Sequence, residues 1–435
     1  MREMKDSGIA WIGVIPQDWE IVRTKSLYCS AKEIAGDRAD DFERLALTLN
    51  GVIKRSKEDS VGLQPEKFSG YQILKKGELV FKLIDLENVA TSRVGLSPYT
   101  GIVSPAYIVL SKQSRAKDLV VRYSMYHFLS MWQREIFNQM GDNGVRSSLN
   151  AKELLNIPHP FPSIYEQKRI VTFLDAQCAE IDAVLEKTRA SIEEYKKLKQ
   201  AVITQAVTKG IRGDRPMKNS GIEWIGDIPE SWEVSSVRYI GQLQNGISKG
   251  GEFFGKGFPF VSYGDVYKNY ELPHSVSGLI DTTEDERATY SVEYGDIFFT
   301  RTSETIEEVG FSCVCKRSIP NATFAGFIIR LRPFCADEKI LTDYAKYYFR
   351  GEHIRAYLVK EMNLVTRASL GQTLLKGMSV IVPPKSAQKE IAEYLDDKCA
   401  DIDALVAKKQ QYLTEIENYK KSLIYEYVTG KKEVV

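Results

Sequence analysis

The stretch SGIAWIGVIPQDWE at residues 7–20 returns as SGIEWIGDIPESWE at residues 220–233. A second block also repeats, because residues 146–208 match residues 367–429 without a gap, 221 positions further on (367 − 146). Repeats of 20–50 residues are typical of solenoids, whereas a repeat this long predicts two copies of a whole domain with its connector. We therefore expect internal pseudo-twofold symmetry and a binding target that itself comes in two halves.

The composition is that of an ordinary globular protein. The chain has 435 residues, of which 43% are hydrophobic and 27% charged, so we expect two or three domains. The N-terminus does not resemble a signal peptide, and no apolar run approaches the roughly 20 residues that span a bilayer. Six cysteines without a C-x-x-C pair, together with four dispersed histidines, predict no metal site and a cytoplasmic protein. The net charge of +1 gives no global indication of nucleic-acid binding.

Similarity between the two halves is uneven, and this predicts the domain organisation. The repeated blocks flank two bodies with little in common, apart from short strand-like islands around residues 77–82 and 295–301. We expect an α+β fold in which two similar bodies with β-sheet cores carry different surfaces. The predicted segments are an N-terminal segment (1–20), a first body (21–155), a central long helix (156–215), a repeat of the N-terminal segment (216–233), a second body (234–378) and a C-terminal long helix (379–435).

Each repeat ends in a predicted long helix with one apolar face. The proline-rich stretches at 158–162 and 383–384 cannot be helical, and Ser163 with Glu166 fits a capping box at a helix start. From there apolar residues recur in steps of four and three over about five heptads. The stripe in the first helix is Leu174, Cys178, Ile181, Leu185, Thr188, Ile192, Tyr195, Lys199, Val202 and Ala206. The stripe in the second helix is Leu395, Cys399, Ile402, Val406, Lys409, Leu413, Ile416, Lys420, Leu423 and Tyr427.

A helix with a single apolar face needs a partner. We expect the two helices to pair with each other within the chain, as an antiparallel coiled coil about 65 Å long. The alternatives are that each helix packs only on its own body, or that the faces pair between chains. Lys199 and Lys420 interrupt the stripe at the same place, either as polar register devices or with ammonium groups that reach out to solvent. Gly210 and Gly430 are expected to end the helices.

The common catalytic motifs are missing. The only Pro-Pro pair, at 383–384, lacks the acidic or Asn and aromatic neighbours of an amino-methyltransferase motif. The stretch at residues 250–257 approaches a phosphate-binding loop, but it lacks the final hydroxyl residue and runs into a strand-like segment. We expect this stretch to be a Gly-rich loop near a ligand backbone. The sequence therefore predicts no active site, no cofactor and no metal in this chain.

The candidate ligand-binding residues lie where a body meets a repeated helix. Guanidinium and hydroxyl groups can bind guanine or phosphate, although the arginines could instead anchor their loops to acidic groups. Lys82 and Arg301 follow the two strand-like islands, and the alignment puts them at matching positions. The competing interpretation is that both are plain surface charges. The tryptophans of the repeated stretch are expected to be packing anchors. The full candidate set for DNA contact is Arg146, Ser147, Ser148, Arg367, Ser369, Lys82 and Arg301.

The whole chain resembles the specificity subunits of type I restriction–modification enzymes. The resemblance is carried by the repeated Ser-Gly-Ile-x-Trp-Ile-Gly motif and by the helix starts QKRIVTFLD (167–175) and QKEIAEYLD (388–396). The motif Ile-Asp-Ala follows at 181–183 and 402–404. The resemblance implies two target-recognition domains, each of which reads one half of a bipartite double-stranded DNA site. The pair of helices would set the length of the unread gap.

The resemblance also implies partners, because the chain itself would be non-catalytic. Two modification subunits would methylate adenine N6 with S-adenosylmethionine, and restriction subunits would translocate DNA with ATP and Mg²⁺. Such a complex would be cytoplasmic in a prokaryote, with no membrane partner. Two alternatives remain from the sequence: the specificity chain of a single-complex enzyme that both methylates and cleaves, and a coiled-coil scaffold that binds no DNA.

Overall fold

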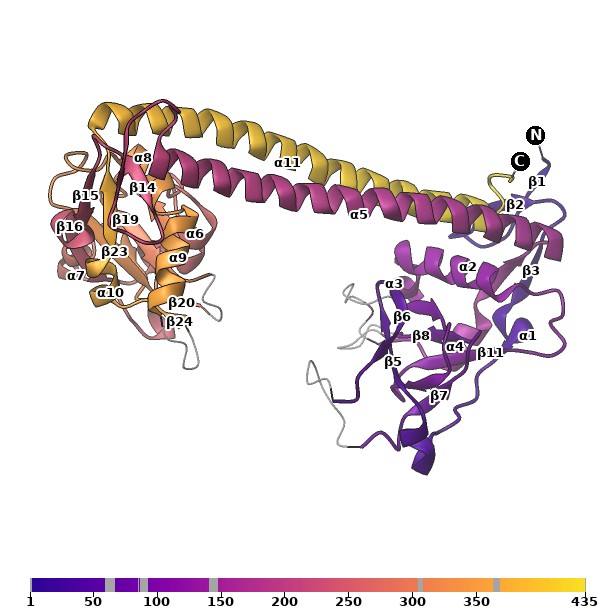
Figure 1. Cartoon of the computed structure of the whole chain (residues 1–435). Helices are drawn as coiled ribbons and strands as arrows, with labels where there is room; N and C mark the ends of the chain where they lie inside the picture. The colour runs from indigo at the N-terminus through magenta and orange to yellow at the C-terminus, as the bar shows by residue number, and fades with distance from the viewer. Residues whose placement is uncertain are drawn as a thin grey trace. The chain divides into compact units, whose positions relative to one another are not determined.

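The computed structural model describes residues 2–58, 67–84, 86, 93–140, 148–303, 308–362 and 368–434. The chain divides into two compact units. Unit 1 comprises Met1–Arg189 and Gln411–Val435, and unit 2 comprises Ala190–Gln410. Helices α5 (Ile164–Lys209) and α11 (Lys385–Val428) cross the boundary, so each unit contains a part of both. Both units mix helices and sheets, which confirms the predicted α+β class (Figure 1).

Unit 1 contains two four-stranded sheets, in the orders β6-β5-β10-β7 and β4-β11-β8-β9. Only the β5–β10 pair is parallel among these described strands. Phe81 on β8 packs edge-to-face against Phe128 of α2, with ring centroids 5.0 Å apart, in the core between sheet and helix. The elements are β4 (Tyr28–Cys29), β5 (Arg44–Thr48), β6 (Gly51–Arg55), β7 (Gln72–Leu74), β8 (Leu79–Phe81), β9 (Val94–Leu96), β10 (Gly101–Val103), β11 (Ile108–Lys112), α1 (Thr24–Leu27), α2 (Val121–Gln133), α3 (Ile136–Met140) and α4 (Ala151–Asn156).

Unit 2 contains a four-stranded sheet β16-β23-β19-β21 and a three-stranded sheet β18-β17-β22. Its strand pair β19–β23 corresponds to β8–β11 of unit 1, because Ile297 lies opposite Leu331 as Leu79 lies opposite Leu110. The elements are β16 (Gly241–Asn245), β17 (Phe254–Val261), β18 (Gly278–Ile280), β19 (Ile297–Thr300), β20 (Thr302–Ser303), β21 (Ser312–Val314), β22 (Thr323–Phe324), β23 (Ile328–Pro333), β24 (Ala368–Ser369), α6 (Tyr263–Lys268), α7 (Glu284–Thr289), α8 (Thr342–Tyr348), α9 (Glu352–Glu361) and α10 (Gln372–Gly377).

Each unit holds one copy of the repeated N-terminal stretch, folded in the same way. A short hairpin comes first, β1 with β2 in unit 1 and β13 with β14 in unit 2. The next strand pairs with the strand that leads into a long helix, β3 with β12 and β15 with β25. Trp19 and Trp232 are fully buried, as expected of packing anchors. The strands are β1 (Met4–Asp6), β2 (Val14–Pro16), β3 (Glu20–Arg23), β12 (Pro158–Phe161), β13 (Met217–Asn219), β14 (Asp227–Pro229), β15 (Glu233–Ser236) and β25 (Ser379–Val382).

The start of α5 shows why the helix begins where it does. The N–H of Glu166 donates to Ser163 Oγ at 3.3 Å, which is one half of the predicted capping box. The carboxylate of Glu166 does not close the box on Ser163, and instead accepts from Trp19 and Arg2. Gln167 is fully buried and links the helix start to the body, since its amide donates to the carbonyl of Asp118 at 3.0 Å. Gln388 makes the equivalent bonds in unit 2.

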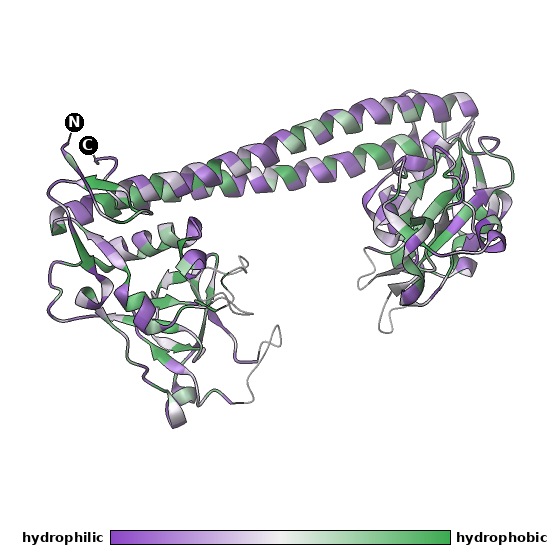
Figure 2. Ribbon diagram, turned by 180° about the vertical axis from the view of Figure 1, so that it is seen from behind, coloured by the Kyte–Doolittle hydropathy of each residue, from purple (hydrophilic) through white to green (hydrophobic). Residues whose placement is uncertain are grey.

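The two long helices run antiparallel to each other in both units. In unit 1, Lys420 binds Asp182 and Arg189 binds Glu417. In unit 2, Lys199 binds Asp403 at 2.6–2.8 Å. These contacts confirm the predicted pairing of the helices within one chain. Hydrophobic and hydrophilic residues alternate along both helices in Figure 2.

The predicted stripe lies in this helix contact. The fully buried members are Leu174, Cys178, Leu185, Thr188, Ile192, Ala206, Leu395, Cys399, Ile402 and Leu423. The partly buried members are Ile181, Tyr195, Lys199, Val202, Val406, Lys409, Leu413, Ile416, Lys420 and Tyr427. The ammonium of each of the two lysines binds an aspartate of the opposite helix, and the side chains are only 15% and 20% exposed.

Each body is attached to the frame through the same tyrosine. Tyr123 on α2 donates to the carbonyl of Val428 at 2.9 Å, at the end of α11. Its equivalent on α8, Tyr344, donates to the carbonyl of Val207 at 3.1 Å, near the end of α5. The end of α11 is closed by Gly430, whose φ is +70° and whose added Cβ would lie 2.4 Å from Pro16 Cδ. Both the left-handed backbone and the close approach therefore require glycine.

Candidate nucleic-acid interface

Arg301 lies where β19 leaves the main sheet of unit 2. Its N–H donates to the carbonyl of Phe327 at 2.8 Å, and its carbonyl accepts from the N–H of Leu370 at 2.7 Å. The last directly paired residues of these strands, Thr300 and Ile328, are fully buried. Arg301 directly follows β19 and Phe327 lies in the turn that precedes β23, so the backbone bond between them holds the two residues side by side at the strand ends. Phe327 is 63% exposed and Arg301 is half-buried.

Ser369 reaches the same strand end from a distant part of the sequence. It lies on β24, which pairs with β20, and Thr302 is directly opposite it. Ser369 is exposed. The structure therefore brings together two of the predicted contact residues, Arg301 and Ser369.

Unit 1 repeats this arrangement. Ser148 forms an isolated bridge with Ile84, and the N–H of Leu149 donates to the carbonyl of Leu83 at 2.9 Å. Ser148 is exposed, and Lys82 is half-buried directly before this segment. The predicted residues Lys82 and Ser148 therefore also lie on neighbouring segments.

The backbone bonds correct one detail of the sequence comparison. Leu149 binds the carbonyl of Leu83, whereas its equivalent, Leu370, binds the carbonyl of Arg301. The residue equivalent to Arg301 is therefore Leu83 and not Lys82, so the predicted matching is wrong by one residue. The aligned segments differ in length by one residue, and only the strand register decides where the extra residue falls.

Three of the seven predicted contact residues lie outside the described part of the chain. Arg146, Ser147 and Arg367 belong to the ranges 141–147 and 363–367, and they remain predictions.

The Gly-rich stretch at residues 250–257 leads into the central strand of the three-stranded sheet. It forms a short 3-10 turn at 251–253 and then enters β17, whose pairing with β18 shifts register between Phe254 and Phe258. A Cβ on Gly257 would lie 2.6 Å from the carbonyl oxygen of Ile280, and its φ of +90° favours glycine. The glycine at 257 thus serves a β-bulge, and the expectation of a ligand-binding loop gains no support from these contacts.

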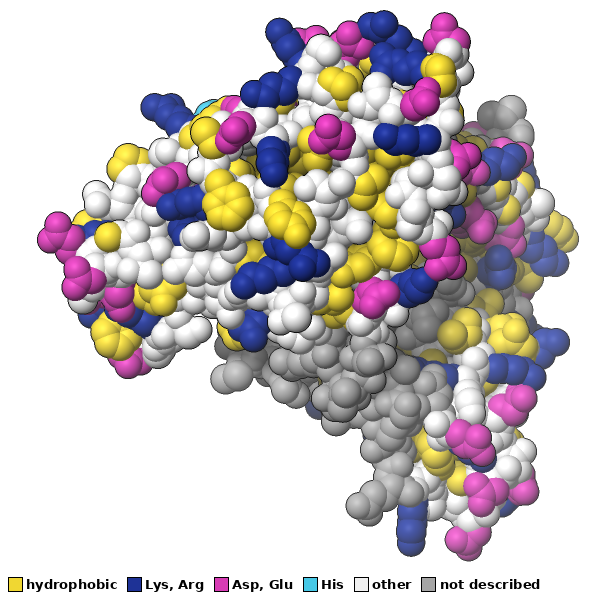
Figure 3. Space-filling model, turned by 60° about the vertical axis from the view of Figure 1, so that its left-hand side comes forward, with side chains coloured by type: hydrophobic (Ala, Val, Ile, Leu, Met, Phe, Trp, Pro, Cys, Tyr) yellow, Lys and Arg dark blue, Asp and Glu magenta, His cyan; other side chains and the backbone are white. Residues whose placement is uncertain are grey.

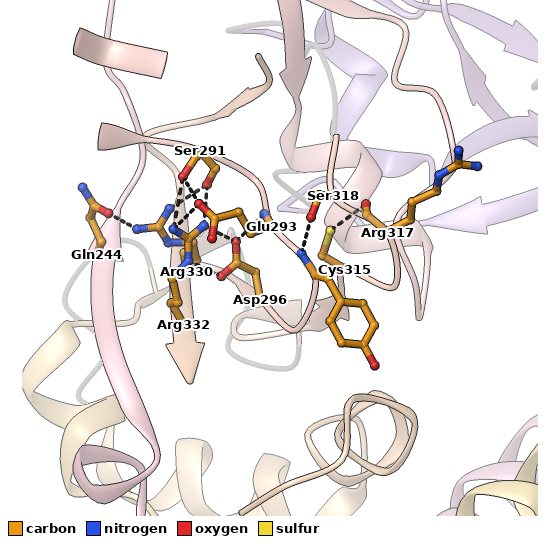
Figure 4. Close-up of polar contacts among 10 residues, drawn as sticks. Gln244, Ser291, Glu293, Asp296, Cys315, Arg317, Ser318, Arg330 and Arg332 are labelled. Carbon is orange, nitrogen blue, oxygen red and sulfur yellow. Dashed lines mark hydrogen bonds and ion pairs between the residues drawn. The ribbon is translucent and has the colours of Figure 1, made fainter. Parts of the chain in front are cut away.

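A buried polar network that the sequence did not predict stiffens the sheet of unit 2 (Figure 4). Arg332 binds both carboxylate oxygens of the fully buried Asp296, at 2.7 and 2.6 Å. Burial raises the pKa of Asp296, and the paired guanidinium offsets part of that rise. Arg330 donates to the carbonyl of Ser291 at 2.6 Å. The guanidinium groups of both arginines are bound within the fold, so their role is structural.

In unit 1 the equivalent positions are occupied by Ser111 and Glu78. Ser111 donates to Glu78 Oε1 at 2.6 Å, where unit 2 has the Arg332–Asp296 pair. The carboxylate is thus kept in both units, while its partner differs.

The surface of unit 2 carries charges of both signs. In Figure 3, where this unit comes forward, Lys and Arg side chains are interspersed with Asp and Glu side chains, and hydrophobic groups lie between them. No one-sided basic face is seen in this view, which agrees with the near-neutral net charge.

No three His, Cys, Asp or Glu side chains in the described ranges lie together as a metal-binding group. Within the same residues, none of the helices combines the length and apolarity of a membrane span.

Comparison with known proteins shows what this chain resembles. A family model described as "Type I restriction modification DNA specificity domain" matches residues 229–417. The MjaVIII specificity subunit of Methanocaldococcus jannaschii, a type I restriction enzyme, is 24% identical over 97% of this chain and 94% of its own length. This chain is similar to the specificity subunits of type I restriction enzymes.

Other specificity subunits of type I enzymes are also similar to this chain. That of the type I enzyme EcoKI from Escherichia coli is 24% identical over 73% of this chain and 67% of its own length. A solved chain from work on assembly and conformational transition of the type I R-M system covers 96% of this chain and 99% of its own length, with a TM-score of 0.70 at 15% identity. At that identity the likeness concerns the fold of the specificity subunit.

Proposed function

We propose that this chain is the DNA-recognition subunit of a type I restriction–modification complex and reads a bipartite site, one half per unit. The observation that carries the proposal is the repeated frame with unlike bodies. Tyr123 attaches one body to the C-terminal end of α11, and Tyr344 attaches the other through the same kind of bond to the C-terminal end of α5. The side chains at the equivalent strand ends differ, with Leu83 in one unit and Arg301 in the other. Residues 21–155 and 234–378 are the proposed target-recognition domains.

The paired helices would fix the number of unread base pairs between the half-sites. Both run through the two units without a break, and their contacts hold them in one register. A stiff pair of helices keeps the spacing constant, whereas a flexible linker would not.

The partners follow from the family. Two modification subunits are proposed to bind the frame and to methylate adenine N6 with S-adenosylmethionine, and restriction subunits would add ATP- and Mg²⁺-dependent translocation. The chain itself would contribute recognition and no chemistry. We place such a complex in the prokaryotic cytoplasm, where its double-stranded DNA lies.

The test is to map N6-methyladenine by single-molecule sequencing in cells that express the neighbouring modification subunit, with and without this chain. A bipartite motif with a fixed gap that depends on this chain is the expected result. Methylation by a well-expressed complex that does not depend on the chain would overturn the proposal.

A further inference from the structure

We propose that Arg301, Phe327, Asn245 and Gln372 form a base-reading cluster in unit 2, in which Arg301 recognises a guanine in the major groove. This inference rests on the proposed function and adds to it the residues that determine one position of a half-site. Arg301 directly follows β19, Phe327 directly precedes β23, Asn245 ends β16 and Gln372 begins α10.

Backbone pairing brings three of them to the same end of the sheet. Arg301 is opposite Phe327 through the bond between its N–H and the Phe327 carbonyl. Asn245 lies opposite Ile329, two positions along from Phe327. Gln372 joins them across the sheet edge, because its Nε2 donates to Asn245 Oδ1 at 3.0 Å.

This cluster begins where the apolar core ends. On β19 and β23, Phe299, Ile329 and Leu331 are buried against the helices of unit 2. One step further along the strands stand Arg301 and Phe327, and Phe327 is 63% exposed. An exposed phenylalanine beside an arginine has no role in core packing, and it fits contact with a thymine methyl group or a base step.

Arg301 differs from the other arginines of its sheet. Arg330 and Arg332 are held by the buried network around Asp296 and Ser291. Across the described ranges the guanidinium of Arg301 makes no hydrogen bond or ion pair, and it is half-buried. Its fork of donors is therefore available for guanine O6 and N7.

The equivalent positions of unit 1 carry other side chains. Leu83, which is 1% exposed, replaces Arg301 and extends the apolar core. The strand register makes Ala106 the equivalent of Phe327, and the repeat makes Ala151 the equivalent of Gln372. Such divergence on a common backbone is expected where two units read different bases.

The test uses the complex of this chain with its modification subunits and maps the methylated motif. Arg301→Ala, Arg301→Lys and Phe327→Ala are each expected to broaden one or two neighbouring positions in the half-site of unit 2. The other half-site and the gap stay unchanged. Discrimination at the affected position should fall roughly 10- to 100-fold, since a bidentate contact carries that much. The lysine keeps the charge but loses the fork.

Matched controls come from the same unit. Phe334→Ala removes a phenylalanine that is 64% exposed, at the other end of β23 and about 20 Å away. Arg317→Ala removes an exposed arginine. Neither control should alter the motif.

An unchanged motif in Arg301→Lys and Phe327→Ala would overturn the cluster, as would a uniform weakening of both half-sites. If Arg301→Ala lowers the melting temperature of the complex, the role of Arg301 is judged from the motif of the Arg301→Lys variant. Failure of the proposed function would look different, because the unaltered chain would then specify no bipartite motif.

Discussion

A single carboxylate distinguishes the two copies of the buried tryptophan. Trp19 Nε1 donates to Glu166 Oε2 at 2.9 Å, and Arg2 binds the same carboxylate. Ala387 stands at the equivalent place in unit 2. Within the described chain, Nε1 of the fully buried Trp232 has no hydrogen-bond partner. A buried donor without a partner costs stability, so the frame of unit 2 is weaker at this point.

Glu166→Ala should lower the free energy of unfolding by roughly 1–3 kcal/mol, because it leaves the buried indole N–H without its acceptor and removes one of the two carboxylates that bind Arg2. Ala387→Glu should raise the stability of unit 2, since it supplies the missing acceptor. Urea unfolding followed by tryptophan fluorescence measures both. The control is Glu186→Ala, at an exposed place on α5, where a change within about 0.5 kcal/mol is expected. Equal losses at 166 and 186 would contradict this account.

Buried histidines make the stability of unit 1 sensitive to acid. His127 and His159 are fully buried with ring centroids 4.5 Å apart, and Ser124 Oγ lies 3.1 Å from His159 Nε2. Burial lowers the pKa of His127 to about 3 and that of His159 well below its usual value. Since the unfolded chain binds protons near pH 6.5 and the folded chain does not, stability falls as the pH drops below about 6.5.

Each histidine should contribute a slope of about 1.4 kcal/mol per pH unit between roughly pH 6 and 4. The double variant His127→Tyr with His159→Val, which installs the residues found at the equivalent positions of unit 2, should flatten this dependence. His274→Gln, a change at an exposed histidine, serves as control. Urea titrations from pH 4 to 8 that show the same slope in all three proteins would refute the assignment.

At the scale of elements, the stability of the frame depends on the contact between α5 and α11. Leu174 is fully buried in a cluster with Leu423 and Ile424 of the opposite helix, whereas Val184 on the same helix is 40% exposed. Leu174→Ala should therefore cost about 2–5 kcal/mol, and Val184→Ala within about 0.5 kcal/mol. Hydrogen exchange along the helices measures the difference. Similar costs for both would mean that the stripe is not the contact.

The helices were predictable because their information is local and periodic. Steps of four and three residues identified the stripe from Leu174 onward, and Gly210 and Gly430 marked the ends. The role of Glu166 was only half predicted, since the donors to its carboxylate, Trp19 and Arg2, lie far away in the sequence. The Arg332–Asp296 pair was missed for the same reason.

The candidate contact residues were harder to predict than the frame. Sequence similarity marked the strand ends, and the structure brought Arg301 to Ser369 and Lys82 to Ser148. The backbone pairing makes Leu83, and not Lys82, the equivalent of Arg301. Such a strand register cannot be read from a short alignment. Phe327 belongs to no recognisable sequence motif, and its exposure is a property of the folded sheet.

At the scale of the whole molecule, helix length should control the unread gap. Arg189 and Gln410 occupy equivalent places on α5 and α11. Repeating one heptad after each of them preserves the apolar stripe and lengthens both helices by about 10 Å. We expect the gap to lengthen by at most about three base pairs, with both half-sites unchanged. A heptad in only one helix breaks the pairing and serves as control. An unchanged gap in the double insertion would show that the helices do not set the spacing.

The most direct test of the central claim is a chain that carries the same body twice. Residues 234–366 replace residues 21–145, and both junctions fall in repeated sequence. If each body reads one half-site on a pseudo-twofold frame, the methylated motif of this chain should become a palindrome, built from the half-site of unit 2 and its inverted copy with the original gap. A stable complex that still methylates the original asymmetric motif would contradict the assignment of one half-site to each unit.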